Sequence, residues 1–159
     1  MNEAEARAAV VREAREWIGT PYLPMGRVKG SGTDCAQILI VIFHTVLPEY
    51  VPLIETGQYP PDWFMHCETE TPEKPGRYLR IVEQYARKVD RPARDGDIAL
   101  FKRGRCIHHG GIVDQWPRLL QALWQDRAHV FQGGVGYDDA DKGELGASFV
   151  GIWTLKAWS

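Results

Sequence analysis

The sequence has no long hydrophobic run, few cysteines and no excess of basic charge. No stretch approaches the ~18 apolar residues of a membrane-spanning helix. The three cysteines, Cys35, Cys67 and Cys106, are too few and odd in number for a disulfide framework, so we expect free thiols and a reducing compartment. The 19 basic and 21 acidic residues give a net charge of −2, which argues against nucleic acid as the main partner.

The length predicts a single domain over residues 1–159. Domains typically have roughly 100–200 residues, and the 44% hydrophobic and 25% charged content is ordinary for a globular protein. The N-terminal residues include Glu3, Glu5 and Glu13 and lack the apolar centre of a secretory signal. We therefore expect synthesis in the cytoplasm and, for action outside the cell, delivery by another route.

Helical periodicity precedes strand-like segments along the chain. Helices are predicted at residues 3–18, 35–47 and 78–89. Strands are predicted at residues 97–102, 107–114, 118–123, 130–132 and 149–155. Glycine- and proline-rich segments at 19–32, 48–76 and 133–146 are typical of loops. Helices followed by an antiparallel sheet indicate an α+β domain.

Cys35 is a candidate nucleophile because it follows a glycine-rich turn and begins a predicted helix. The positive end of the helix dipole favours a thiolate, and free backbone N–H groups there bind an oxyanion. The alternative is a buried structural cysteine, since free cysteines are among the most buried residues.

A catalytic thiolate needs a base, and histidine is the usual one. The five histidines are His44, His66, His108, His109 and His129. Adjacent strand residues point to opposite faces, so only one of His108 and His109 is expected to face Cys35. Gln121, a lone polar residue in an apolar strand, is a candidate to orient the imidazole; the alternative is an exposed glutamine.

A metal site is a weaker interpretation of the same residues. Cys106 and His108 share one face of a strand, and Cys67 and His66 lie elsewhere in the chain. No Cys-x2-Cys pair is present, so the spacing does not favour zinc. We expect neither a metal nor another cofactor.

Four segments carry a resemblance to a known family. They are Trp17-Ile18-Gly19-Thr20-Pro21-Tyr22, Gly30-Ser31-Gly32-Thr33-Asp34-Cys35, Arg94-Asp95-Gly96-Asp97-Ile98-Ala99-Leu100-Phe101 and His109-Gly110-Gly111-Ile112-Val113. In this order and spacing, the chain resembles the NlpC-type papain-fold cysteine peptidases from about residue 7 to about residue 133. It looks most like their short phage-type branch, found in tail-tip cell-wall peptidases and gene transfer agents.

The resemblance implies a role for each matching residue. It places the nucleophile at Cys35, the general base and acid at His109, and the residue that orients the histidine at Gln121. Tyr22 falls on a tyrosine that borders the oxyanion region. Asp34 falls on an acid that helps cap the site and recognises the amino group of the substrate. The implied fold is papain-like, with the nucleophile at a helix N-terminus packed on an antiparallel sheet.

Two departures from the family pattern stand out. Gln121 occupies a position that is often histidine, and it brings no charge to stabilise an imidazolium. Ala36-Gln37 replaces the usual Ser-Gly after the nucleophile, which implies different packing under the site. Segment 48–76 is long for a loop. We expect it to be a wall of the substrate cleft or a docking surface for a tail protein; the alternative is a surface excursion with its own small cluster.

The function implied by the resemblance is hydrolysis of peptide bonds in peptidoglycan stem peptides, at the bond between the γ-carboxyl of D-glutamate and the diamino acid. The protein would be made in the bacterial cytoplasm and then become part of the tail tip of a phage or gene transfer agent, bound to tail hub proteins. The alternatives are an inactive structural tail protein of the same fold, and an amidase or acyltransferase using the same residues.

Overall fold

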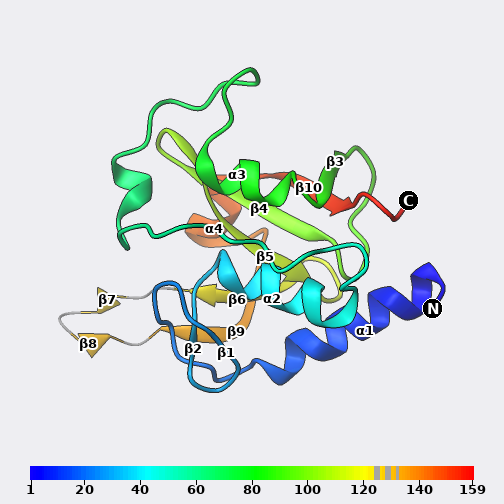
Figure 1. Ribbon diagram of the computed structural model, residues 1–159. Helices are drawn as coiled ribbons and strands as arrows, with labels where there is room; N and C mark the ends of the chain where they lie inside the picture. The colour runs from blue at the N-terminus through cyan, green and yellow to red at the C-terminus, as the bar shows by residue number, and fades with distance from the viewer. Residues whose placement is uncertain (124–125, 128–129, 132) are drawn as a thin grey trace.

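The computed structural model combines helices, which lie mostly in the first half of the chain, with strands that lie mostly in the second half (Figure 1). It describes residues 1–123, 126–127, 130–131 and 133–159. The helices are α1 (Glu3–Glu16), α2 (Gln37–Val46), the 3-10 turn η1 (Trp63–Met65), α3 (Arg77–Val82) and α4 (Gly143–Ser148). The strands are β1 (Arg27–Val28), β2 (Gly32–Thr33), β3 (Ala86–Val89), β4 (Ile98–Arg103), β5 (Cys106–Val113), β6 (Arg118–Leu123), β7 (Asp126–Arg127), β8 (Val130–Phe131), β9 (Gly134–Asp139) and β10 (Phe149–Leu155).

The main sheet has six antiparallel strands in the order β3-β10-β4-β5-β6-β9. Helices α1, α2 and α3 each contact the central strand β5, and α1 packs against α2. A hydrophobic cluster fills this helix–sheet contact, with Val10, Ile40, Phe43 and Ile112 almost completely buried. The predicted α+β class, with N-terminal helices packed on an antiparallel sheet, is confirmed.

Helix α1 begins with a capping box. The Asn2 side chain accepts a hydrogen bond from the Glu5 backbone N–H at 2.8 Å, and the Glu5 carboxylate accepts one from the Asn2 backbone N–H at 3.0 Å. Trp17 is only 1% exposed, as expected, but Ile18 is 47% exposed. The predicted helix over 3–18 ends at Glu16, so Ile18 does not share the buried helical face.

Helix α2 is apolar on almost every side, which agrees with its burial between α1 and the sheet. It begins at Gln37, two residues after Cys35, rather than at Cys35 itself. The Asp34 carboxylate caps it, since Oδ1 accepts hydrogen bonds from the N–H groups of Ala36 at 3.0 Å and Gln37 at 2.8 Å. The free N–H groups at the start of α2 therefore bind the Asp34 carboxylate rather than the Cys35 thiol.

Three sequence-based assignments of secondary structure are corrected. The predicted helix 78–89 divides into α3 and the edge strand β3, which pairs with β10. The glycine-rich segment 133–146, predicted as a loop, contributes β9 and the start of α4 because β6 supplies a pairing partner for β9. The predicted strand 130–132 is outside the main sheet: β8 pairs with β7, and Gln132 lies outside the described residues.

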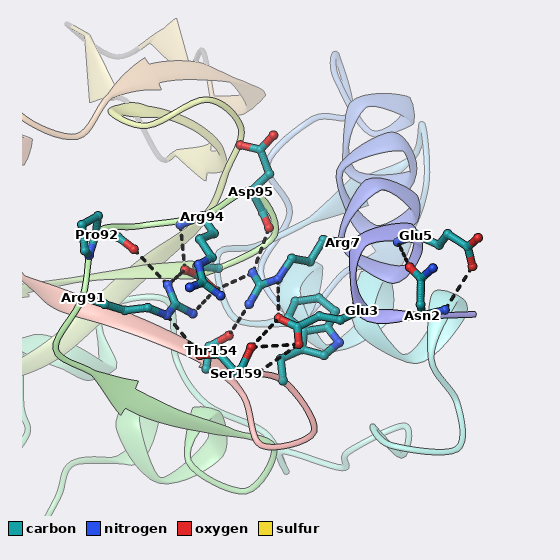
Figure 2. A network of polar contacts seen from close by, with 12 residues as sticks. Asn2, Glu3, Glu5, Arg7, Arg91, Pro92, Arg94, Asp95, Thr154 and Ser159 are labelled. Atoms are coloured by element: carbon teal, nitrogen blue, oxygen red, sulfur yellow. Dashed lines mark hydrogen bonds and ion pairs between the residues drawn. The ribbon is translucent and has the colours of Figure 1, made fainter.

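Arg7, Arg91 and Thr154 belong to one polar network (Figure 2). The acid that accepts from both arginines, Asp97, is fully buried. Asp97, directly before β4, accepts hydrogen bonds from Arg7 at 2.8 Å and from Arg91 at 2.7 Å. Arg7 also donates to Thr154 of β10 at 3.1 Å. These contacts join α1, β4 and β10 in one polar network. In the described ranges, no helix is both long and apolar enough to cross a membrane.

Candidate active site

A cavity of about 670 Å³ brings Cys35 and His109 together with Tyr22. This volume is in the range of small-molecule sites. Segment 61–65, which includes η1, contributes to its lining, and so do Asp138 of β9 and residues 142–145, which include the first turn of α4. Phe101 and Arg103 of β4 and His108 and His109 of β5 also line the cavity. The cavity therefore joins parts of the chain more than 100 residues apart.

Three hydrogen bonds hold Cys35 in this cavity. Its thiol donates to the backbone carbonyl of His108 at 3.5 Å, and its side chain also hydrogen-bonds with the hydroxyl of Tyr22. The buried hydroxyl of Tyr78 donates to the backbone carbonyl of Cys35 at 2.7 Å. The sequence does not indicate Tyr78 as part of the site, because only the folded chain brings α3 to Cys35.

Burial and the negative charge of Asp34 raise the pKa of the Cys35 thiol above its usual value. The hydrogen bond from Tyr22 opposes this shift without reversing it. The direction of this shift is opposite to the one expected from the helix dipole, which favours a thiolate. The physical reason is that Cys35 precedes α2 by two residues and lies next to a buried carboxylate.

His109 is 7% exposed and makes a short hydrogen bond to Gln121. Its Nε2 lies 2.7 Å from Oε1 of Gln121, so the imidazole N–H donates to the amide oxygen. Gln121 is 3% exposed, which excludes the alternative of a solvent-facing glutamine. Burial lowers the pKa of His109, although Gln121 and the charge of Asp138 act in the opposite direction. Near pH 7 the imidazole is neutral and can accept a proton.

His108 and His109 both line the cavity, contrary to the prediction that only one of them faces Cys35. The register of β4 with β5 shifts here: Phe101 pairs with His109, but Lys102 pairs with Ile107. His108 is thus the extra residue of a β-bulge, which turns its side chain to the same face. Its ring stacks on Phe64 with centroids 4.8 Å apart, and burial lowers its pKa to about 4.

Gly110 and Gly111 make room for two residues of the site. A Cβ atom on Gly110 would lie 2.9 Å from the Tyr78 hydroxyl, and one on Gly111 would lie 3.2 Å from Cβ of Gln121. Any larger residue at Gly110 would displace the hydroxyl that holds the Cys35 carbonyl. The two glycines therefore serve close packing beneath the site.

Asp34 is 2% exposed, and both of its carboxylate oxygens are used within the chain. Besides the two N–H groups at the start of α2, it accepts hydrogen bonds from the Met25 N–H at 2.8 Å and from the Tyr59 hydroxyl at 2.5 Å. The expected capping role agrees with this geometry. Direct recognition of a substrate amino group by Asp34 does not, because four donors of the protein surround the carboxylate.

Gln37, one of the residues that depart from the family pattern, fastens segment 48–76 beneath the site. Its amide nitrogen donates to the hydroxyls of Thr56 and Tyr59, each at 3.0 Å, and its oxygen accepts from Arg27 at 2.6 Å. Arg27 also donates to the backbone carbonyl of Ile54. Since residues 61–65 line the cavity, segment 48–76 forms a wall of the cleft.

The remaining thiols and histidines lie outside this cavity or beyond the described residues. The Cys67 thiol donates to the carbonyl of Phe64 at 3.1 Å, and Cys106 approaches the same oxygen at 4.0 Å. His44 contacts the carbonyl of Val51, and His66 pairs with Asp62. His129 lies outside the described residues. Within those residues no group of three or more His, Cys, Asp or Glu side chains is arranged to hold a metal ion.

Comparison with solved structures identifies the fold. The NlpC/p60 domain of the peptidoglycan hydrolase SagA matches with a TM-score of 0.50 and 18% identity, covering 85% of this chain and 90% of that one. The fold is that of NlpC/p60 domains. No protein-family model and no curated protein sequence matches the chain.

Two larger NlpC/p60 proteins show the same likeness. A lipoprotein-like NLP/P60 family protein from Staphylococcus aureus matches with a TM-score of 0.56 and 16% identity, over 96% of this chain. An NlpC/P60 family protein from Bacillus cereus matches with a TM-score of 0.56 and 13% identity, over 92% of this chain. This chain spans only 42% and 39% of their respective lengths. At these identities the likeness concerns the fold.

Proposed function

We propose that this protein is a cysteine peptidase that hydrolyses peptide bonds in peptidoglycan stem peptides. The observation that carries the proposal is the 2.7 Å hydrogen bond between His109 and Gln121 inside the cavity that Cys35 also lines. A nucleophile, a base and a third group that orients the base are the parts of a cysteine hydrolase. The NlpC/p60 fold, shared with a peptidoglycan hydrolase domain, supports the choice of substrate.

The geometry supports a mechanism that begins from an uncharged Cys35 thiol and an uncharged His109 imidazole. Because the pKa of Cys35 is raised and that of His109 is lowered, His109 takes the thiol proton as the sulfur attacks the scissile carbonyl. The Cys35 backbone N–H, with the Tyr22 hydroxyl beside the sulfur, would bind the resulting oxyanion. The imidazolium then protonates the leaving amine, and water hydrolyses the thioester to release the acid and restore the thiol.

We assign the scissile bond as the one between the γ-carboxyl of D-glutamate and the diamino acid. We also propose that residues 1–159 act as one domain, made in the bacterial cytoplasm and assembled with hub proteins at the tail tip of a phage or gene transfer agent. These finer assignments rest on the resemblance of the four sequence segments to the phage-type peptidases.

The proposal is tested by mass spectrometry of diaminopimelate-type stem peptides incubated with the reduced protein. We expect cleavage by the wild type and by Cys67→Ala, and none by Cys35→Ala or His109→Ala, with all four proteins folded by circular dichroism. The Cys67 variant is the matched control because its thiol lies outside the cavity. Cleavage that persists in folded Cys35→Ala would refute the proposal. No cleavage by the wild type would favour a structural role, and an acyl-transfer product would favour the acyltransferase.

A further inference from the structure

The Gln121 amide contacts an acidic side chain, that of Asp138. Asp138 lies outside the four segments that resemble the NlpC-type family. Gln121 on β6 pairs with Gly136 on β9, and Asp138 follows two residues later on the same face of β9. Gly136 carries no side chain, so the Gln121 amide reaches past it. Its Nε2 donates to Oδ2 of Asp138 at 3.3 Å, while Oδ1 of Asp138 accepts from the Asp139 N–H at 2.8 Å.

This contact decides which way the amide of Gln121 points. An ionised carboxylate only accepts hydrogen bonds, so Asp138 selects the amide NH₂ and turns the amide oxygen toward His109. That oxygen in turn requires a proton on Nε2 of His109, 2.7 Å away. The unprotonated nitrogen of the neutral ring is then Nδ1, which is free to act as the base.

We propose that Asp138 is a positioning residue of the active site, which fixes the tautomer of His109 through Gln121 and stabilises its imidazolium. This inference rests on the proposed function of Cys35 and His109. The Asp138 carboxylate also supplies the negative charge that Gln121 lacks, because it accepts a hydrogen bond from the Gln121 amide.

Among the charged groups that the structure describes near His109, Asp138 is the one that favours the positively charged imidazolium. Arg103 disfavours it, but Arg103 is paired with Glu144 at 2.8 Å. His108 is neutral near pH 7, since its pKa is about 4, and the raised pKa of Cys35 keeps that group neutral as well. Asp138 is exposed, so salt is expected to screen its effect.

The first test follows the pKa of His109 by NMR in the Cys35→Ala protein, which needs no activity. We expect Asp138→Asn to lower this pKa by about half a unit, and 1 M NaCl to reduce the difference because the screening length is then only about 3 Å. Asp139→Asn is the matched control, as it removes the same charge one residue away, where Asp139 pairs with Lys142 at 3.0 Å. Equal pKa values in the two variants would overturn the proposal.

The second test compares kinetics in single and double variants. Asp138→Asn should lower kcat about three- to tenfold with little change in KM and move the acid limb of the pH profile downward; Asp139→Asn should do neither. In a Gln121→Ala background the Asp138 substitution should have no further effect, because the link to His109 is already lost. Additive losses would contradict the proposal. If no variant cleaves the peptide, the peptidase assignment fails, and the NMR experiment still decides the role of Asp138.

Discussion

At the scale of single residues, the environments of Cys35 and His109, the two side chains proposed to react, both favour the uncharged form. Cys35 is buried beside the Asp34 carboxylate, and His109 is buried between Phe101 and Gln121. Burial penalises the thiolate and the imidazolium alike, so each pKa moves in the direction that keeps the pair neutral. In the proposed reaction we therefore expect the proton to move during the attack rather than before it.

This neutral pair predicts the acid limb of the pH profile. His109 acts as a base only when it is unprotonated, and its pKa lies below the ordinary value of 6.5. Between about pH 5 and pH 8, peptidase kcat/KM should therefore show an acid limb whose midpoint lies below pH 6.5. Steady-state rates across this range measure it. An acid limb centred above pH 7 would instead indicate a stabilised imidazolium in the free enzyme.

Tyr78 and Tyr85 offer a contrast between two buried hydroxyls. Tyr78 donates to the Cys35 carbonyl, whereas the Tyr85 hydroxyl has no hydrogen-bond partner among the described residues. Tyr78→Phe should cost about 1–3 kcal/mol of unfolding free energy and lower kcat, because it leaves a buried carbonyl unpaired. Tyr85→Phe should be neutral or stabilising. Urea denaturation tests both, and equal losses in the two variants would contradict this account.

At the scale of elements, two local features shape the cavity. The β-bulge at His108 turns two consecutive histidines to one face of β5, and Gln37 ties the start of α2 to segment 48–76. Neither follows from hydrophobic periodicity. The bulge depends on how β4 pairs with β5, and the role of Gln37 depends on where Thr56 and Tyr59 lie after folding.

Removing the Gln37 amide should loosen the cavity wall. In Gln37→Ala, Thr56 and Tyr59 each lose a donor and Arg27 loses an acceptor, so residues 54–65 should exchange amide hydrogens faster. We also expect KM to rise more than kcat falls, because residues 61–65 line the cavity and are not among the residues proposed to carry out the reaction. Gln84→Ala, on an exposed residue, is the control. Unchanged exchange in residues 54–65 would show that Gln37 does not fasten the wall.

At the scale of the whole molecule, Asp97 joins distant parts of the chain. It is fully buried between Arg7 of α1 and Arg91, and Arg7 continues to Thr154 of β10. Burial alone would raise its pKa, but the hydrogen bonds from Arg91 and Arg7 outweigh burial and hold the pKa below 3.8. The stabilisation is therefore complete above the unfolded value of about 3.8 and is lost as the pH falls through the lower folded value.

Neutralising this acid should destabilise the protein strongly. Asp97→Asn removes the carboxylate that pairs with Arg91 and leaves the buried Arg7 with Glu3 alone as counter-charge, which should lower the unfolding free energy by about 3–5 kcal/mol. Asp95→Asn, two residues away on an exposed side chain, should change it by less than about 1 kcal/mol. Urea denaturation at pH 7 compares them, and a loss below 1 kcal/mol for Asp97→Asn would contradict the role assigned to the network.

The sequence predicts the α+β class and brings Cys35, His109, Gln121, Tyr22 and Asp34 to notice, because motifs and apolar periodicity are local. The segments it assigns wrongly owe their structure to distant partners: β3 to β10, and β9 to β6. The sequence does not indicate Tyr78 or Asp138 as site residues, for the same reason. Each belongs to the site only through a contact across 17 or more positions of the chain.

The measurement that tests the central claim most directly is the intact mass of the protein after rapid acid quenching with excess stem peptide. The account predicts an acyl adduct of the peptide mass minus its leaving group, mapped to Cys35 and absent from Cys35→Ala. Product formation without any adduct, together with full activity of Cys35→Ala, would contradict a thioester mechanism. An adduct mapped to Cys67 or Cys106 would place the nucleophile elsewhere.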